Sequence, residues 1–316
     1  MRIDTHVHFR DGVQNYKETI AHGLAVAKSA GVEYVFDMPN TSPPILRRAD
    51  VEKRLALVPE SEKERYYLYI GATANPQQLK EAATVVNENE RVIGFKMFAG
   101  KSTGDMQIIE EEKQKLVYKT LADAGYDGVI SVHCEKESMM KDFFDPKNPI
   151  SHSLSRPKEA EIESVKDQIK FAKEANFKGT LNICHVSCAE SVELKEQAKK
   201  ELKVTCEVMP HHVIWGNEKM NEPCGALYKM NPPLRNPEDV KALQECIRGG
   251  KVDFIGTDHA PHSIGEKLYA GYPSGFPSLY LYKDFVENFL PSIGVSQKLI
   301  DEMTFSNIVK TFNLKL

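Results

Sequence analysis

The sequence predicts an α/β protein of the (β/α)8 class, a closed TIM barrel in which each strand is followed by a helix. Eight short runs rich in β-branched and aromatic residues alternate with amphipathic stretches across about 260 residues, the length typical of one such barrel. No glycine-rich phosphate loop follows the first run, which argues against a doubly wound open sheet. Residue types that bind metals end several runs, and a barrel would bring those ends together on one rim.

The strands and helices are expected in strict alternation. The first strand begins at Ile3, and a helix over 16–30 follows, ending at Gly31, a residue favoured just after a helix. The other expected strands cover 32–38, 67–72, 92–98, 128–134, 180–186, 204–209 and 252–257. The other expected helices cover 49–57, 77–87, 109–124, 159–175, 189–202 and 237–248.

Two segments break this alternation, and two further segments are considered separately. The stretch 143–157 is rich in Pro, Asn and Ser, so we expect a long surface loop in which His152 is exposed, and 215–234 is a second irregular insertion. The segment 99–106 holds Ser102, Thr103 and Gly104 and fits either a mobile lid or a plain surface loop. The segment 296–316 is expected to form a helical cap on a single barrel domain that spans 1–316.

The composition is that of a soluble globular protein. The 316 residues are 41% hydrophobic and 27% charged with a formal net charge of -4, and no block of like charge suggests a nucleic-acid or membrane partner. We see no targeting segment or membrane span and expect a cytoplasmic protein. The six cysteines form no CxxC pair, and Cys184 and Cys188 are expected to be buried thiols rather than metal ligands.

The first strand carries a pair of histidines. His6 and His8 are two residues apart, so in a strand both imidazoles point the same way and could hold one divalent metal. Arg10 has the same parity and would place a fixed cation beside that metal, which suits an anionic substrate. A lone His-x-His is as often an ordinary polar strand end, so the other strand ends decide its interpretation.

Further residues of this kind stand at later strand ends. His133, His185 and Asp258 close three of the expected strands, and Lys96 lies on the inner face of a fourth. A buried ammonium needs a reason, because an unpaired charge in the interior is costly. Lys96 would either form an ion pair with Asp258 or Glu135, or carry a carbamate, a carboxylate-like group able to bridge two metals.

At this point the sequence resembles the amidohydrolase superfamily, and within it the dihydroorotase family. The resemblance covers nearly the whole chain and rests on an ordered set of short motifs. They lie at 4–12 (Asp-Thr-His-Val-His-Phe-Arg-Asp-Gly), 38–41 (Met-Pro-Asn-Thr), 94–96 (Gly-Phe-Lys), 132–135 (Val-His-Cys-Glu), 184–187 (Cys-His-Val-Ser), 206–212 (Cys-Glu-Val-Met-Pro-His-His), 231–235 and 256–262.

The resemblance implies two Zn²⁺ ions bridged by a carbamylated Lys96 and a hydroxide. One zinc would take His6, His8, Lys96 and Asp258, and the other Lys96, His133 and His185. The implied reaction is the reversible hydrolysis of the cyclic amide of L-dihydroorotate to N-carbamoyl-L-aspartate in de novo pyrimidine synthesis. Asp258 would act as the catalytic acid and base.

The family's substrate-carboxylate ligands map onto Arg10, Asn40 and His262. An arginine offers a bidentate fork, and amide and imidazole groups add donors; Asn40 by itself would read as a turn residue. His211 and His212 follow the seventh strand and receive no role, and His22 is expected to be exposed on a helix.

Many relatives add a small β-sandwich to the barrel. Only two residues precede Ile3 and the chain ends soon after Asn313, so we expect no appended sandwich. The segment 275–280 also lacks the acidic residue expected near its end.

Two other functions stay open at this stage. One is another cyclic amidase, such as a hydantoinase or an allantoinase, whose lysine strand is similar. The other is an inactive relative that acts as a scaffold, although no ligand has been lost here. A small molecule is the expected partner, and the resemblance suggests a homodimer.

Overall fold

Eight parallel strands form one sheet whose spatial order follows the chain. The computed structural model describes residues 1–102, 104 and 106–316. The strands are β1 (Ile3–Val7), β2 (Tyr34–Asp37), β3 (Tyr66–Gly71), β4 (Val92–Phe98), β5 (Val129–His133), β6 (Thr180–Ile183), β7 (Lys203–Val208) and β8 (Phe254–Ile255). Backbone bonds join the last strand to the first, because the Asp258 amide donates to the His6 carbonyl over 2.8 Å and the His8 amide to the His259 carbonyl over 2.7 Å. The predicted (β/α)8 barrel is confirmed.

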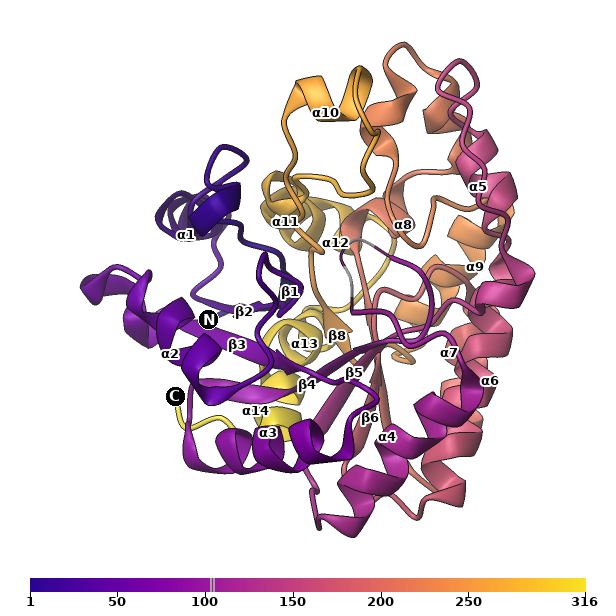
Figure 1. Cartoon of the computed structure of the whole chain (residues 1–316). Helices are drawn as coiled ribbons and strands as arrows, with labels where there is room; N and C mark the ends of the chain where they lie inside the picture. Colours follow the sequence, from indigo (N-terminus) through magenta and orange to yellow (C-terminus); the bar gives the residue numbers. More distant parts are fainter. Residues whose placement is uncertain (103, 105) are drawn as a thin grey trace.

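Helices surround the strands (Figure 1). They are α1 (Ile20–Ser29), α2 (Arg48–Ala56), α3 (Pro76–Glu88), α4 (Glu111–Asp123), α5 (Ser151–Ser155), α6 (Lys158–Glu174), α7 (Ala189–Ala198), α8 (Pro210–Ile214), α9 (Pro237–Arg248), α10 (Ile264–Leu268), α11 (Leu279–Asp284), α12 (Leu290–Ser292), α13 (Gln297–Asp301) and α14 (Asn307–Phe312). Local signals fix several starts. The Asn75 and Asn236 side chains accept amide hydrogens at the N-termini of α3 and α9, each ahead of a proline in the first helical turn.

Several element boundaries differ from the sequence expectation, and two of them have a clear structural reason. The helix expected from residue 16 begins at Ile20, because the Thr19 side chain caps it and Asp11 Oδ2 accepts the Ile20 amide over 2.9 Å. The eighth strand is only two residues long. The residues after it turn towards β1, where Thr257 donates its amide to Asp4 Oδ1 over 2.9 Å.

The expectation for residues 143–157 is wrong in part. Residues 151–155 form α5, and the His152 side chain is buried instead of exposed. Its Nε2 lies 2.9 Å from the Met230 carbonyl and 3.0 Å from Asn231 Oδ1. A composition rich in Pro, Asn and Ser indicates irregular backbone, but it does not reveal that a distant segment covers the loop.

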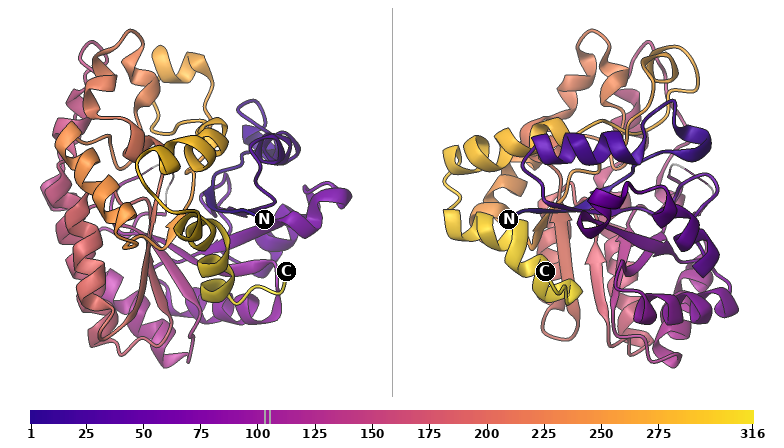
Figure 2. Two further views of the ribbon diagram at one scale, coloured as in Figure 1. Left: turned by 180° about the vertical axis from the view of Figure 1, so that it is seen from behind. Right: turned by 90° about the vertical axis from the view of Figure 1, so that its left-hand side faces the viewer.

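The C-terminal helical segment packs against the strand starts. The Phe312 ring of α14 packs against the rings of Phe36, Tyr69 and Phe254, with centroids 5.0 to 6.2 Å apart. The two views of Figure 2 show this segment, in yellow, beside the barrel, with both chain ends on the same side of the molecule. The other end of the barrel, where the strands finish, is left to the polar residues described next. None of the helices in the described ranges is both long and apolar enough to cross a membrane.

Candidate metal and substrate site

The predicted metal-facing residues meet at the ends of the strands. His6, Lys96, His133, His185 and Asp258 are all buried, and they come from five different strands or the turns directly after them. A pocket opens onto this cluster. It is lined by His6, His8, Arg10, Asn40, Phe98, Ser102, His133, His185, Asn231, Asp258, Ala260, Ser274 and Gly275.

His6 and His8 turn one nitrogen each towards a common centre with Asp258. The two Nε2 atoms are 3.2 Å apart, and Asp258 Oδ1 lies 2.9 Å from His8 Nε2 and 3.4 Å from His6 Nε2. The opposite nitrogens are held from behind: His6 Nδ1 lies 2.6 Å from Glu207 Oε1, and His8 Nδ1 lies 2.7 Å from Asn40 Oδ1. These outer contacts fix the orientation of both rings.

His133 and His185 form a second pair. His133 Nδ1 lies 3.0 Å from His185 Nε2, while His133 Nε2 lies 2.8 Å from Glu135 Oε2. Glu135 is in turn bound through both oxygens by the Arg156 guanidinium, whose Nε lies 3.0 Å from Oε1. The ring centroids of His6 and His185 are 5.3 Å apart, so the two pairs are neighbours.

This donor set fits a metal. If the nitrogens that face Glu207, Asn40 and Glu135 carry the hydrogens, then His6 Nε2, His8 Nε2 and His133 Nδ1 are bare lone pairs. The lone pairs of His6 and His8, whose Nε2 atoms are 3.2 Å apart, repel each other unless a cation lies between them. Imidazole nitrogen and carboxylate oxygen are the ligands that zinc favours.

The electrostatics keep the ligand atoms available. Burial lowers the pKa of His6, His133 and His185, and nearby Lys96 lowers the pKa of each further, which favours the neutral form of these rings that metal binding requires. Burial opposes ionisation of Asp258, but His6 and His8 outweigh it and hold its pKa at about 2.

Lys96 is fully buried and has no carboxylate partner among the described residues. Its Nζ donates to Cys184 Sγ over 3.0 Å and lies 5.0 Å from the centroid of the Phe98 ring. The ion pair with Asp258 or Glu135 that the sequence left open is therefore not found: Glu135 is taken by Arg156 and His133, and Asp258 by His8.

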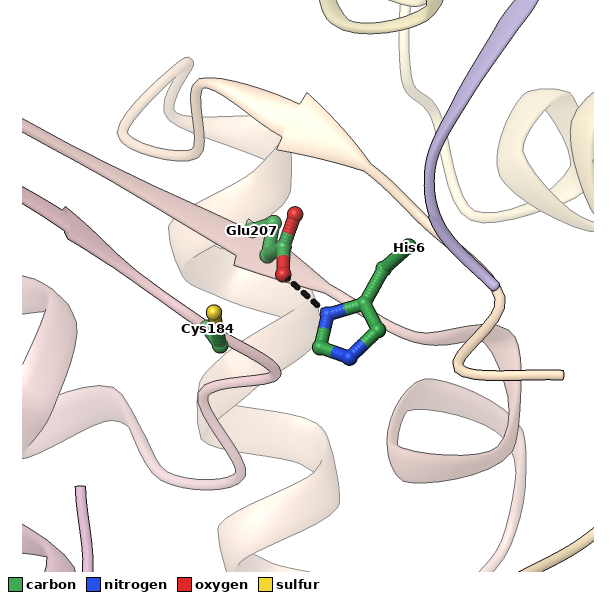
Figure 3. A group of neighbouring side chains, drawn as sticks. All are labelled: His6, Cys184 and Glu207. Atoms are coloured by element: carbon green, nitrogen blue, oxygen red, sulfur yellow. Dashed lines mark hydrogen bonds and ion pairs between the residues drawn. The ribbon is translucent and has the colours of Figure 1, made fainter. Parts of the chain in front are cut away.

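Cys184 and Glu207 lie close to His6, one of the first histidine pair (Figure 3). Their potential ligand atoms lie within 4.8 Å of one another. Cys184 and Cys188 are both buried, as the sequence suggested, and burial raises the pKa of each thiol well above its usual value.

Backbone conformation also marks the site. His185 (φ 36°) and Asp258 (φ 50°) adopt the left-handed region, which non-glycine residues rarely enter. Such strain is concentrated at functional sites, where the surrounding structure holds it in place. At both positions it turns the chain just past a strand so that the side chain faces the pocket.

The predicted substrate-binding residues lie at one side of the metal-facing cluster. Arg10 and Asn40 line the pocket, and Arg10 Nη2 is 3.4 Å from His262 Nε2. His262 Nδ1 lies 3.0 Å from Lys17 Nζ. Burial, and then Arg10 and Lys17, lower the pKa of His262 to about 3, so the ring is neutral. Arg10 and His262 are brought together from opposite ends of the sequence.

The residues whose roles the sequence left undecided occupy different places in the structure. Ser102 lines the pocket, whereas Thr103 lies outside the described residues. His211 and His212 are both buried, and no hydrogen-bond partner for either ring nitrogen of His211 is found in the described part of the chain. His22 has a side chain that is 66% exposed, as expected.

Sequence reasoning missed the residues that support the ligands. Glu207 received no role, Glu135 entered only as a partner for Lys96, and Arg156 was assigned to a surface loop. Burial is the signal that could have found two of them: Glu135 and Glu207 lie in or beside strands otherwise built from apolar residues, where an unpaired carboxylate would be costly.

Curated relatives share the sequence over most of its length. A dihydroorotase from Thermococcus kodakarensis is 36% identical over 88% of this chain and 59% of its own length. A dihydroorotase from Fusobacterium nucleatum is 31% identical over 99% of this chain and 72% of its own length. The chain belongs to the dihydroorotase family. It spans only about three fifths of the length of the Thermococcus kodakarensis dihydroorotase and of one from Methanosarcina mazei.

Solved structures of other proteins share the fold of this chain. An L-hydantoinase from Arthrobacter aurescens superposes with a TM-score of 0.82 at 23% identity, covering 99% of this chain and 70% of that one. A Saccharomyces cerevisiae dihydroorotase in complex with 5-fluoroorotic acid gives 0.77 at 18% identity, covering 100% and 84%. At these identities the likeness concerns the fold alone. No protein-family model matches the chain. Membership of the dihydroorotase family, a group of cyclic amide hydrolases, suggests a metal cofactor.

Proposed function

We propose that this protein is a dihydroorotase that hydrolyses the ring amide of L-dihydroorotate to N-carbamoyl-L-aspartate, reversibly, in de novo pyrimidine synthesis. One observation carries the proposal: a cluster of metal-ligand side chains shares its pocket with Arg10 and Asn40, next to His262. A cyclic amide that bears a carboxylate needs both features at once, the first for the amide and the second for the carboxylate.

Two zinc ions would be held by the residues at the strand ends. His6, His8 and Asp258 would bind one and His133 and His185 the other, with a carbamylated Lys96 between them. The burial of Lys96 without a carboxylate partner among the described residues supports the carbamate, because carbamylation removes the positive charge. When bound, zinc would act as a Lewis acid that polarises the amide carbonyl and makes water more acidic.

Asp258 is the residue that would move the proton. Its carboxylate faces the pocket, and its low pKa means that it is ionised and able to accept a proton from the attacking water. The same carboxyl group would then pass that proton to the ring nitrogen as the amide bond breaks. The positive φ of Asp258 and its contacts with His6 and His8 keep Oδ1 at this place.

Arg10, Asn40 and His262 would bind the substrate carboxylate. Arg10 is buried, and its Nε donates to the Pro261 carbonyl over 3.2 Å, which fixes the guanidinium at the pocket wall. A buried guanidinium pairs strongly with a carboxylate, because both are shielded from water. This contact would orient the ring so that its amide faces the zinc ligands.

The wider setting is also part of the proposal. Residues 1–316 would form one barrel domain whose C-terminal helices act as a cap, in a cytoplasmic enzyme that acts on small molecules and assembles as a homodimer. The packing of Phe312 against Phe36 and Phe254 supports the cap.

The test is a comparison of substrates. Metal-replete protein is assayed side by side with dihydroorotate, hydantoin and allantoin. We expect turnover of dihydroorotate to exceed that of the other two, because only dihydroorotate offers a ring carboxylate to Arg10. Preference for hydantoin or allantoin would transfer the assignment to another cyclic amidase, and metal loading without any turnover would favour the scaffold.

A further inference from the structure

A second pocket adjoins the one at the strand ends. Three residues line both pockets: Ser102, Asn231 and Ser274. The second pocket also has Lys141, Arg156 and Lys229 in its wall. We call this second pocket the vestibule. Because the walls are shared, a small molecule in the vestibule lies next to the metal-facing pocket.

Basic groups outnumber acidic ones in the vestibule. Lys101 also lines it, but its Nζ is 2.5 Å from Asp142 Oδ2, and Asp142 is the only carboxylate among the described residues of the wall. Arg156 is paired with Glu135 behind the wall. Lys141 and Lys229 form no ion pair within the described part of the chain. The whole protein has a formal net charge of -4, so this local excess of cations does not follow from composition.

Lys229 is the cation best placed to bind an anion. It is half-buried, and its Nζ donates to the Tyr272 carbonyl over 2.6 Å and lies 4.8 Å from the Phe144 ring centroid. An ammonium has three hydrogens, so further donors remain for a ligand. Burial, followed by the charge of Arg156, lowers the pKa of Lys229 to about 8, and Asp142 offsets this only in part.

A second buried lysine stands behind it. The Lys267 Nζ donates to the carbonyls of Lys229 (2.8 Å), Gly275 (2.8 Å) and Pro273 (3.1 Å). These bonds tie together the backbone of two segments that line the pockets, which is a sufficient structural role for Lys267. Burial together with Lys229 lowers its pKa to about 7, so Lys267 adds only part of a positive charge at pH 7.

We propose that the vestibule is an anion subsite that captures the open-chain dicarboxylate, N-carbamoyl-aspartate, before it enters the metal-facing pocket. This assignment rests on the proposed function. The open-chain compound carries two carboxylates and dihydroorotate carries one, so a cationic vestibule attracts the open-chain compound more strongly. Lys229 supplies the charge and the free donors that hold a carboxylate at the shared wall.

Ionic strength separates the two substrates. With the full-length, metal-loaded protein at pH 7, kcat/KM is measured for both compounds across a series of KCl concentrations. Salt screens charge attraction in proportion to the charges involved, so the logarithm of kcat/KM falls roughly twice as steeply for the dicarboxylate as for dihydroorotate.

Variants locate the effect. Lys229→Met removes the charge and keeps much of the aliphatic stem, and it lowers kcat/KM for the dicarboxylate by about threefold at low salt while changing that for dihydroorotate less. Lys229→Arg keeps the charge and preserves the value. Lys298→Met is the matched control: it removes a lysine whose side chain is 84% exposed on α13, outside the vestibule.

The outcomes are distinct. Equal salt slopes for the two substrates, or equal effects of Lys229→Met and Lys298→Met, overturn the vestibule subsite while leaving the dihydroorotase assignment intact. Absence of turnover with both substrates overturns the proposed function, and the subsite with it.

Discussion

The two sides of the pocket are built in different ways. On the metal-facing side, His6, His133 and Asp258 stand on strands or directly after them, and buried carboxylates hold two of the imidazoles from behind. On the side that would bind the substrate carboxylate, Arg10 and His262 stand on loops, and His262 lies between Arg10 and Lys17. Carboxylates behind a ligand strengthen its hold on a metal, whereas a buried guanidinium is suited to bind a carboxylate. One side of the pocket would therefore carry out the reaction, and the other side would bind the substrate carboxylate.

Removal of a proposed metal ligand should produce the largest difference in activity between variants of the two sides. His185→Ala removes a nitrogen 3.0 Å from His133 Nδ1, and we expect kcat to fall by at least about a thousandfold because the Lewis acid is lost with it. The measurement is kcat together with zinc content by mass spectrometry. His22→Ala, an exposed histidine on α1, is the control and should change neither. Retention of zinc and of full activity in His185→Ala would contradict the assignment.

The supporting carboxylates should differ from each other. Glu135→Gln leaves the buried Arg156 without its anion, so we expect the free energy of unfolding to fall by about 3 kcal/mol. Among the described residues, Glu207 has no cationic side chain bound to it, and it accepts from His6 and Thr5; burial raises its pKa to about 7.

Glu207→Gln keeps an oxygen for His6 Nδ1, so this change should cost little stability and should weaken zinc binding by about tenfold. Chemical denaturation and zinc titration with a competing chelator measure the two effects. Equal losses of stability in the two variants would show that the Arg156 pairing does not distinguish these carboxylates.

Removal of positive charge from the side that would bind the substrate carboxylate should leave zinc binding unchanged. For Arg10→Met we expect kcat/KM for dihydroorotate to fall about fifty-fold, because a charge-assisted pair is lost, with no change in zinc content. Dihydrouracil, which lacks the ring carboxylate, should be hydrolysed equally slowly by both proteins. An equal loss with dihydrouracil would mean that Arg10 supports the catalytic groups and does not recognise the carboxylate.

The smallest expected effect is on the free energy of unfolding at acidic pH, and it arises from the buried His152. Burial, and then Lys229 and Arg156, lower the pKa of His152 from its ordinary 6.5 to about 3. Below pH 6.5 the unfolded chain binds a proton that the folded chain refuses, so the stabilisation present above pH 6.5 is lost as the pH falls. Between pH 7 and pH 5.5 this loss is about 1 kcal/mol. His152→Gln should lose less stability over that range in denaturation curves, and identical pH dependence in both proteins would exclude His152 as the source.

Sequence reasoning identified the metal-facing residues more completely than the residues that hold them in place. Strand periodicity placed His6 and His8 on one face, and the barrel rule brought His133, His185 and Asp258 to the same rim, because parallel strands end together. The supports come from elsewhere in the chain. Arg156 reaches Glu135 from a segment whose composition indicates a loop, and His152 is buried by residues about 80 positions away. Composition and periodicity describe local backbone, so they could not anticipate these long-range contacts.

Zinc reconstitution tests the central claim most directly. The protein is stripped of metal, zinc is returned in steps, and dihydroorotate hydrolysis is followed by the loss of ultraviolet absorbance in the same samples, with Lys96→Ala alongside. The account predicts no turnover without metal, activity that rises with zinc and levels off near two equivalents per chain, and no recovery in Lys96→Ala. Full activity in the metal-free protein, or none at any zinc loading, would contradict it.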